Sequence, residues 1–596
     1  MHFAGGANSS ETILRARMAA VLLLAVVSSL LITASGRADE PAEGEYPTSV
    51  VDQITLGGSE LDQPMTAGTD AAGNIYVIGV TNSADFPIKG GLGEEFGPNP
   101  GYLSYQQGFV TKLDPEGEIV YSTYLPLKNT MPDAATVAAD GSVYIASFEN
   151  KSDGQLHVYE LNPAGDELAY ETVIPGFAAG AWNAIEVDAE GRAIVVGQVR
   201  GPDFPVTGDA EMPESEPGRA PTGIVRLGAG GAIGYASYLE GGAWAVTVAP
   251  DGRVYVGGSA YPGAFGDAPG APADEHKGFW DGTVSRYSPS LRKLEYGAYL
   301  GGSGHDAVLD LAVDGQDHVF VAGQTDASPI KQVEPLDPES TASGQMNALY
   351  GELSPDGDEV LQLARLGGNG GGTNAYDIEI APDGSKIVVG MTDAASFPAH
   401  GAPPGDLGPT AALAFRVEER QLTHSTAYVN EFRSSAMAVI PTADGLVHIV
   451  GTAMLEDPMG SLIGQGDVFV TTLRLDPYVD DPYVELPAQQ RLKAESPRIK
   501  LRAGAREDVF LRAGAKIAIR VGGSHRTIRL EAPRHRADGY RKARLALAPA
   551  TRGSERLLRK ALSGNRKVRA KVTVGFRDRG GAVERKHASV TLSGRR

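Results

Sequence analysis

The stretch Asp70-Ala71-Ala72-Gly73-Asn74-Ile75-Tyr76-Val77-Ile78-Gly79 recurs six more times along the chain in looser form. Each copy joins an Asp- and Gly-containing turn to a run of Val, Ile and Tyr. The steps between the closing residues of successive copies are 51 to 67 residues; these closing residues are Gly79, Ala146, Gly197, Gly257, Gly323, Gly390 and Gly451. Self-similarity at a nearly fixed period is the signature of a repeat architecture, here with seven units.

Each unit predicts four β-strands. An apolar run leads into the Asp-Gly turn and a β-branched run follows it, which is typical of a hairpin. A third strand comes after a loop, as at 108–113 and 467–473, and a fourth ends in Tyr-Leu, as at 119–125 and 294–300. Four strands repeated radially favour an all-β fold, a seven-bladed β-propeller. A β-sandwich array is the rival, but its domains would need independent cores and longer repeats.

The two ends of the repeat region predict how the ring closes. Residues 49–57 are similar to a fourth strand such as 296–303, whereas the seventh unit has no comparable strand after 468–473. We therefore expect the amino-terminal segment to form the outer strand of the last blade. Such closure removes the open sheet edges that favour aggregation.

At these residues the chain resembles the seven-bladed β-propeller repeats of exported bacterial proteins. The matching features are Gly73–Thr81 with the following Asp85-Phe86-Pro87, Phe-Pro again at 204–205 and 397–398, and a strand end reading Tyr-Leu-Gly-Gly-Ser at 299–303. The resemblance covers about 430 residues. It implies the fold and no catalytic residues, because such repeats are recognised by structural positions.

Residues 1–38 predict an export signal. Two arginines precede the apolar run 18–32, and small residues follow at 33–36. This order of basic, apolar and small-residue regions is typical of a secretory signal peptide. An uncleaved anchor is the alternative, but about 15 apolar residues are short for a membrane span of about 20. We expect cleavage near residues 36–38 and a protein that is secreted or associated with the cell envelope.

The composition excludes several kinds of site. The 596 residues contain no cysteine, which excludes disulfides, Fe–S clusters, thiolate metal sites and cysteine nucleophiles. The eleven histidines show no metal-binding spacing, and no EF-hand loop or nucleic-acid-binding module occurs in the sequence. We expect no cofactor, no metal, no nucleic-acid partner, no transmembrane segment after signal cleavage, and a monomer.

The charge changes sign near residue 490. Residues 39–490 hold 20 Lys and Arg against 65 Asp and Glu, a net −45, whereas residues 491–596 hold 30 against 8, a net +22. Such a change marks a domain boundary, and the Pro-rich stretch 476–490 is typical of a linker. We expect the propeller over 39–475 and a basic β-sandwich-like module over 491–596.

The module has a pattern of its own. Strands are predicted at 516–521, 527–530, 567–574 and 588–592, together with one short helix at 554–562 that has Ser554 as N-cap and a C-cap at 563–564. The stretch 559–592 is similar to the small Ig-like β modules that end many exported actinobacterial proteins.

Strand 567–574 alternates strictly, which puts Lys567, Arg569 and Lys571 on its outward side. Three basic side chains about 7 Å apart suit a polyanion with repeating phosphates or carboxylates. We expect them to bind an anionic cell-envelope polymer. Two alternatives stay open: these residues only keep the module soluble, or the module docks on the acidic propeller.

One face of the propeller is the candidate ligand site. The loops before the innermost strands and the loops between second and third strands open on the same face, and long loops on a rigid scaffold are where binding residues concentrate. The loops before the innermost strands hold Asp62, Asp133, Trp182, Asn183, Trp244, His305, Asp306, Asn374, Tyr376 and Arg433. From these we select, as ligand-binding, Trp182, Asn183, Trp244, His305, Asp306 and Tyr376. The aromatic rings would stack on a sugar or peptide ring, or instead plug the central channel.

Two chemical interpretations of these loops are less favoured. Ser303, His305 and Asp306 are adjacent in sequence, whereas the members of a catalytic triad meet in space, so we interpret them as part of a turn between blades. The Asp residues of the Asp-Gly hairpins lack a complete calcium-binding pattern, so we interpret them as turn formers.

The leading hypothesis is a secreted, non-enzymatic binding or scaffold protein of the bacterial cell envelope, with a basic module for attachment or docking. The alternative is a secreted propeller enzyme, a glycan lyase or hydrolase. Two close carboxylates facing one cleft would favour the enzyme, and an aromatic surface without them would favour binding.

Overall fold

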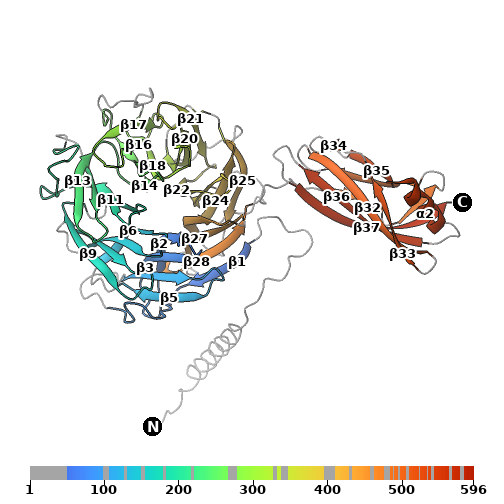
Figure 1. Ribbon diagram of the computed structural model, residues 1–596, viewed down its shortest axis with the longest axis horizontal. Coiled ribbons are helices and arrows are strands. Elements are labelled where there is room, and N and C mark those ends of the chain that lie inside the picture. The colour runs from blue at the N-terminus through green and yellow to red at the C-terminus, as the bar shows by residue number, and fades with distance from the viewer. Residues whose placement is uncertain are drawn as a thin grey trace, which may run out of the picture. The chain divides into compact units, whose positions relative to one another are not determined.

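A computed structural model of the chain contains a propeller and a second, carboxy-terminal β-sheet, which are described here separately (Figure 1). The predicted export signal 1–38 lies outside the described residues. Within the described ranges, no helix is long and apolar enough to cross a membrane. The structure describes residues 50–97, 107–125, 130–149, 155–178, 183–215, 221–265, 278–326, 332–333, 335–336, 346–368, 370–394, 397, 410–428, 433–443, 445–456, 462–475, 483–487, 489–493, 497–504, 509–521, 524–532, 535–537, 543–562, 567–577 and 583–595.

Seven antiparallel four-stranded sheets form the blades, as the repeat count predicts. In the first six blades, four consecutive strands pair in chain order. Blade 1 consists of β2 (Asp62–Thr69), β3 (Ile75–Thr81), β4 (Gln107–Leu113) and β5 (Ile119–Tyr124). Blade 2 consists of β6 (Thr130–Val137), β7 (Val143–Glu149), β8 (Gln155–Leu161) and β9 (Leu168–Pro175). Blade 3 consists of β10 (Asn183–Val187), β11 (Ala193–Gln198), β12 (Thr222–Leu227) and β13 (Ile233–Leu239). Blade 4 consists of β14 (Ala245–Val248), β15 (Val254–Ala260), β16 (Asp281–Tyr287) and β17 (Leu294–Leu300). Blade 5 consists of β18 (Asp306–Val313), β19 (Val319–Thr325), β20 (Asn347–Leu353) and β21 (Val360–Leu366). Blade 6 consists of β22 (Thr373–Ile380), β23 (Lys386–Thr392), β24 (Ala411–Glu418) and β25 (Gln421–Tyr428).

The seventh blade is built from both ends of the repeat region. Its strands are β26 (Arg433–Pro441), β27 (Leu446–Glu456), β28 (Leu462–Arg474) and, on the outside, β1 (Val50–Leu56). β1 runs antiparallel to β28, with Ile54 opposite Val470 and Leu56 opposite Val468. The predicted closure of the ring by residues 49–57 is thus confirmed.

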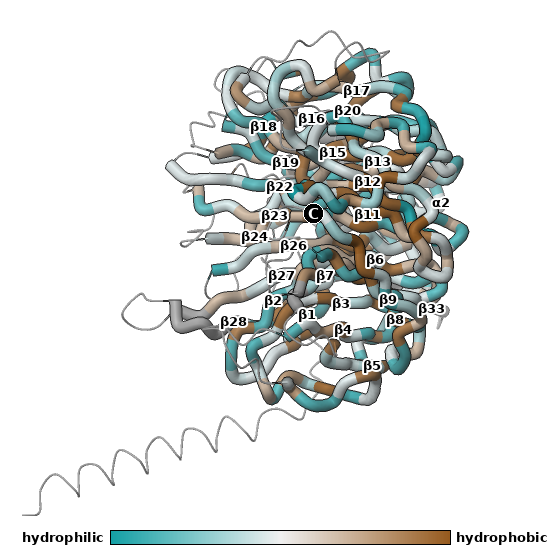
Figure 2. Tube along the Cα trace, turned by 90° about the vertical axis from the view of Figure 1, so that its left-hand side faces the viewer, coloured by the Kyte–Doolittle hydropathy of each residue, from teal (hydrophilic) through white to brown (hydrophobic). Residues whose placement is uncertain are grey.

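The middle strands of the blades are buried on both faces, because each sheet packs against the sheets of the neighbouring blades. All seven residues of β3 are buried, and so are all seven of β20. One apolar cluster joins blades 2 and 3 and another joins blades 4 and 5, so the core is divided into layers between blades. Figure 2 shows hydrophobic stretches in brown along strands such as β11 and β12. Side chains available for function must therefore come mainly from strand ends and loops.

The Asp-Gly hairpins are held by their own carboxylates. In the first, Asp70 Oδ1 accepts the backbone N–H groups of Ala72 and Asn74, at 3.0 Å each, and Gly73 takes a positive φ of 81° that favours glycine. Burial raises the pKa of Asp70, but hydrogen bonds, first of all from Asn74, outweigh it and bring that pKa to about 2. This network confirms Asp70 as a turn former.

The carboxy-terminal sheet surrounds an apolar interior. Its strands are β29 (Tyr483–Glu485), β30 (Gln489–Lys493), β31 (Ile499–Gly504), β32 (Val509–Val521), β33 (Ser524–Glu531), β34 (His535–Ala537), β35 (Ala543–Pro549), β36 (Lys567–Arg577) and β37 (Val583–Arg595), in the order β29-β31-β35-β33-β32-β36-β37-β30, with β34 on β32. The stretch 476–490 is not a bare linker, because β29 and the start of β30 lie in it and pair with β31 and β37. The predicted strands at 516–521, 527–530, 567–574 and 588–592 lie within β32, β33, β36 and β37.

The predicted helix is present as α2 (Arg552–Leu562), which places Leu558 and Leu562 in the interior of the module. It begins two residues earlier than predicted. The Thr551 carbonyl accepts the Glu555 N–H at 3.0 Å and the Thr551 hydroxyl accepts the Ser554 N–H at 3.1 Å. Thr551 is therefore the N-cap, and the assignment of Ser554 was wrong because Ser554 supplies the donor of this bond. The predicted C-cap at 563–564 lies outside the described residues.

Candidate functional site

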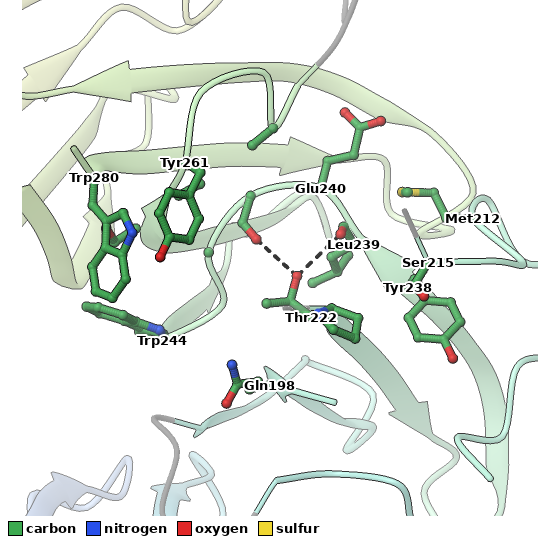
Figure 3. A pocket seen from close by; sticks show the side chains of 16 residues that line it. Gln198, Met212, Ser215, Thr222, Tyr238, Leu239, Glu240, Trp244, Tyr261 and Trp280 are labelled. Carbon is green, nitrogen blue, oxygen red and sulfur yellow. Dashed lines mark hydrogen bonds between the residues drawn. The ribbon is translucent and has the colours of Figure 1, made fainter. Parts of the chain in front are cut away.

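A cavity of about 150 Å³ opens at one end of blades 3 and 4 (Figure 3). It combines the start of the innermost strand of blade 4 with the loop between that blade's second and third strands, the two kinds of loop expected on one face. Its lining residues are Gln198, Met212, Ser215, Pro221, Thr222, Tyr238, Leu239, Glu240, Gly241, Gly242, Trp244, Ser259, Ala260, Tyr261, Ala264 and Trp280.

Three aromatic side chains form one side of this cavity. Trp244 precedes β14, Tyr261 follows β15, and Trp280 precedes β16. The rings of Tyr261 and Trp280 are 5.2 Å apart at an interplanar angle of 88°, an edge-to-face arrangement. Figure 3 shows Trp244 next to both of them. We refer to Trp244, Tyr261 and Trp280 as the aromatic wall.

The aromatic wall is held in place by backbone bonds between blades. The Asp306 N–H donates to the Trp280 carbonyl at 2.8 Å, and the Phe279 N–H donates to the Gly304 carbonyl at 2.9 Å. The loop before β16 in blade 4 is therefore fastened to the start of β18 in blade 5. On the other side, the Trp244 N–H donates to Gly257 O at 2.8 Å. These bonds fix the backbone at Trp280 and Trp244, from which two rings of the wall project.

The aromatic surface continues out of the cavity into solvent. Phe279 is 62% exposed and Tyr261 45% exposed, and their rings lie 6.1 Å apart. His305 lies 5.3 Å from the Phe279 ring and 5.8 Å from the Trp280 ring. His305 Nδ1 in turn lies 3.0 Å from Asp326 Oδ2, which orients the imidazole. Phe279 and Tyr261 thus form a small exposed apolar cluster beside the cavity.

A few polar side chains stand among the largely apolar residues that line the rest of the cavity. The Thr222 hydroxyl donates to the carbonyls of Leu239, at 3.3 Å, and Gly241, at 3.0 Å, as the dashed lines in Figure 3 show. The Ser259 hydroxyl donates to Asp306 O at 2.9 Å. At Gly242 a Cβ atom would lie 2.1 Å from the Ser259 backbone nitrogen, so only glycine fits where these two loops meet.

The predicted ligand-binding residues fall into separate groups in the structure. Trp244 lines the cavity, and His305 contacts the aromatic wall through Trp280. Asn183 is buried, and its side-chain amide donates to Asp133 of the preceding blade. Tyr376 lies on β22 in blade 6 and does not line the cavity, and burial raises its pKa. Trp182 lies outside the described residues.

Ser303, His305 and Asp306 do not form a catalytic arrangement. Asp306 is 1% exposed, and its carboxylate accepts the Gly302 N–H at 2.8 Å, whereas His305 pairs with Asp326 instead. Burial raises the pKa of Asp306 to about 6. The interpretation of this run as part of a turn between blades is confirmed.

Phe279, Trp280 and Tyr261 were not selected from the sequence. Tyr261 and the adjacent pair Phe279-Trp280 lie at the two ends of the segment between β15 and β16, which is a second-to-third-strand segment of the kind expected on the ligand face. Two adjacent aromatic residues directly before a third strand were the available signal. No local sequence pattern indicates the isolated β-bridge between Trp280 and His305, which brings the two loops together.

A second set of acidic residues lines the innermost strands, but these carboxylates hold the blades together. Asp310 in blade 5 accepts the Ile378 N–H of blade 6 at 2.9 Å, and Asp377 in blade 6 accepts the Val439 N–H of blade 7 at 2.6 Å. Burial, and then the neighbouring Asp377, raise the pKa of Asp310 well above its ordinary value. Asp310 and Asp377 therefore have a structural role, because each carboxylate joins two neighbouring blades.

Two further acids of the innermost strands, Glu186 and Glu379, have raised pKa values for the same main reason. Burial raises the pKa of Glu186 to about 7 and that of Glu379 to about 8. Glu186 accepts the Val187 N–H at 2.8 Å and the Thr136 hydroxyl at 3.3 Å, which ties blade 3 to blade 2. In the described part of the chain, no group of three or more His, Asp or Glu side chains is placed to hold a metal ion.

Lys567, Arg569 and Lys571 are exposed on one side of β36, and Ala570, Val572 and Val574 between and beyond them are buried. The alternation predicted for this strand is confirmed. The three residues lie in the carboxy-terminal module and take no part in the aromatic cavity.

Comparison with known proteins gives no family. No protein-family model matches the chain, and no curated protein matches it. Solved structures similar to it include a protein from Lactobacillus plantarum (13% identity, 64% of this chain and 96% of that chain, TM-score 0.34) and a europium-containing methanol dehydrogenase (12%, 76% and 85%, TM-score 0.33). A third is a neuraminidase-like protein from A/bat/Guatemala/164/2009 (10%, 74% and 94%, TM-score 0.30). Likeness at this level carries no argument about function, so the propeller assignment rests on the sheet topology of the chain itself.

Proposed function

We propose that the protein is an exported, non-enzymatic binding protein whose propeller captures a glycan at the aromatic wall. The observation that carries this proposal is the convergence of Trp244, Tyr261 and Trp280 on one cavity of about 150 Å³. Aromatic rings provide large apolar contact area for the C–H faces of a sugar, and a few polar groups at the edges fix its orientation. Ser259 and Gln198 are polar residues in the lining of this cavity.

An unsatisfied donor supports a ligand at this wall. The indole N–H of Trp280 is buried and has no hydrogen-bond partner among the described residues. Buried donors are nearly always paired, and an unpaired one points to a missing partner. The nitrogen is closed to solvent in the structure, so a ligand hydroxyl or carbonyl would supply that acceptor only after a shift of the wall side chains. The exposed ring of Phe279 extends the contact beyond one sugar unit, which favours an oligosaccharide over a monosaccharide.

The acidic groups favour binding over cleavage. Glycoside hydrolysis uses two carboxyl groups on either side of the scissile bond. Among the described lining residues the cavity has one carboxylate, that of Glu240. The paired acids of the innermost strands are engaged by backbone N–H groups of neighbouring blades. Among the described residues, the wall therefore offers no second carboxylate to the hydrolase or lyase alternative.

Two features of the sequence support an extracellular role. The segment 1–38 has the pattern of an export signal, and the propeller repeats resemble those of exported bacterial proteins. The net charge of +22 on residues 491–596 supports a role of the module in attachment to the anionic cell envelope. The module's assignment to the Ig-like class is part of this proposal.

The proposal is tested with the mature chain on glycan and peptide arrays. We expect binding to oligosaccharides, and a loss of at least about tenfold in Trp244→Ala and in Trp280→Ala, since each removes one stacking surface. Val173→Ala, an exposed apolar position on β9, is the matched control and should bind normally.

Thermal unfolding of each variant separates binding from packing. A loss of about 3–5 kcal/mol in Trp244→Ala, as for a core aromatic residue, would identify that side chain as a packing residue. Binding to peptides alone, or full glycan binding by a chain that carries both Trp244→Ala and Trp280→Ala, would contradict the proposal.

A further inference from the structure

The outward side of three adjacent strands in the carboxy-terminal module carries a dense set of basic side chains. β33, β32 and β36 are neighbours in the sheet, and six of their residues are basic, exposed and on the same side. We call this set the basic ladder; it consists of Arg512, Lys516, Arg529, Lys567, Arg569 and Lys571. Only the last three follow from the pattern of a single strand.

The register of the sheet aligns the ladder across strands. Lys571 lies directly opposite Lys516, and Lys516 lies directly opposite Arg529. Neighbouring strands are about 4.8 Å apart, and side chains on the same side of one strand repeat at about 7 Å. The ladder is therefore a two-dimensional grid of positive charge.

This arrangement does not serve the stability of the module. Like charges directly opposite each other on neighbouring strands are destabilising, and the ladder contains two such pairs in one row. The inward side of the same strands supplies the apolar interior, with Ala515, Ile517 and Val572 buried. Solubility alone is better served by interspersed charges of both signs. On the outward side of these three strands, the described exposed residues include one acidic residue, Glu531, and six basic residues.

We propose that the basic ladder is a binding site for a linear polyanion with a phosphate in every repeat. The inference deepens the attachment role in the proposed function and rests on it. A grid of Arg and Lys matches a row of phosphates, because Arg forms paired hydrogen bonds to phosphate oxygens and Lys supplies a point charge. An extended polymer lying along or across the strands meets a new positive charge at each step.

The residues between the basic positions favour a polymer without bases. Gly514 separates Arg512 from Lys516, Thr573 follows Lys571 on the same side, and Ser589 lies opposite Lys571 on β37. Single-stranded nucleic acid is held by aromatic side chains on which its bases stack, together with a basic groove. Small residues at these three positions leave the backbone phosphates as the groups to recognise.

The test uses the full mature chain and linear inorganic polyphosphate as the probe, with affinity measured over a range of salt concentrations. We expect wild-type binding to weaken linearly on a log–log plot of affinity against salt, by roughly 0.7 for each phosphate contact. The triple variant Lys516→Gln, Arg529→Gln, Lys571→Gln should bind at least about tenfold more weakly at 0.1 M salt, with a slope reduced by about 2.

The matched control removes the same charge elsewhere on the module. Arg552→Gln, Arg556→Gln, Lys560→Gln changes three exposed residues of α2 and should keep polyphosphate binding within about twofold of wild type. An equal loss in both triples would show that net charge alone is responsible and would overturn the proposal. Absence of binding by the wild-type chain, as expected if the acidic propeller occupies the ladder, would overturn it too.

Purified cell walls distinguish this inference from the proposed attachment. A chain that binds walls but not polyphosphate refutes the phosphate ladder and leaves attachment standing, whereas a chain that binds neither refutes both. The Trp244→Ala, Trp280→Ala double variant should bind polyphosphate as wild type does, because its changes lie in the propeller.

Discussion

The propeller and the carboxy-terminal module use β-strands in opposite ways. In the propeller, successive residues of a strand such as β3 are all buried, because both faces of each blade pack on neighbours. In the module, β36 alternates between exposed basic and buried apolar residues over Lys567–Val574. Function in the propeller must therefore come from loops and strand ends, as at the aromatic wall. In the module, the face of a strand is itself available for binding.

The largest loss of stability is expected when the strand that closes the propeller is removed. The loss concerns the propeller, whose last blade is completed by β1 from the other end of the repeat region. Deletion of 39–57 removes β1, exposes the edge of β28 and uncovers the buried Leu56 contacts. We expect the free energy of unfolding to fall by roughly 5 kcal/mol, because apolar burial and the six residue pairs between β1 and β28 are lost. We also expect the chains to associate through the exposed edge of β28. Melting temperature and light scattering measure both effects. Deletion of 39–49 is the control, and an unchanged, monomeric 39–57 deletion would disprove the closure.

A pair of adjacent substitutions tests the difference in burial directly. Val77→Ala and Ile78→Ala on β3 should each cost about 2–4 kcal/mol, because both side chains are 0% exposed although they point to opposite faces. On β36, Val572→Ala should cost about 2 kcal/mol, whereas Lys571→Ala should stay within about 0.5 kcal/mol. Chemical denaturation gives all four values. Tolerance of either β3 change would mean that one face of blade 1 is not tightly packed.

The same difference explains what could be predicted from the sequence. The blade strands and the closure by β1 follow from periodic patterns and from counting strands, which are local signals. Trp244 was found because it directly precedes an innermost strand. Trp280 was not selected, because its place at the cavity depends on a bridge to His305 in the next blade. Asn183 was selected for ligand binding, yet it bonds Asp133 of the preceding blade, a partner fifty residues away that no local pattern indicates.

The pH dependence of stability should belong to the propeller. Glu186 and Glu379 have pKa values raised by burial to about 7 and about 8, from 4.5. The folded chain therefore holds protons that the unfolded chain releases, so stability falls as pH rises from about 5 to 8. We expect a loss of about 1–2 kcal/mol over this range and assign most of it to Glu186, because the side chain of Glu379 reaches solvent and its contribution is screened.

The double variant Glu186→Gln, Glu379→Gln should reduce the slope of this profile and be more stable than wild type at pH 8, while acids such as Asp306 and Asp310 still contribute. Glu531→Gln, an exposed position in the module, is the matched control and should leave the profile unchanged. Melting temperatures at pH 5, 6, 7 and 8 provide the measurement. A wild-type profile that rises between pH 5 and 8 would show that other groups dominate.

The smallest effect concerns the start of α2, where the module, unlike the blades, closes its interior with a helix. The Thr551 hydroxyl accepts the Ser554 N–H, so Thr551→Ala should cost about 1 kcal/mol by leaving that donor without its cap. Ser554→Ala should cost less, because alanine keeps the backbone N–H that donates to Thr551 and loses only the exposed hydroxyl contact with Thr551 at 3.1 Å. Far-ultraviolet circular dichroism at 222 nm during denaturation reports on this helix, which packs Leu558 and Leu562 into the interior. If Ser554→Ala lowered the free energy of unfolding more than Thr551→Ala, Ser554 would be the N-cap, and the helix would begin where the sequence predicts.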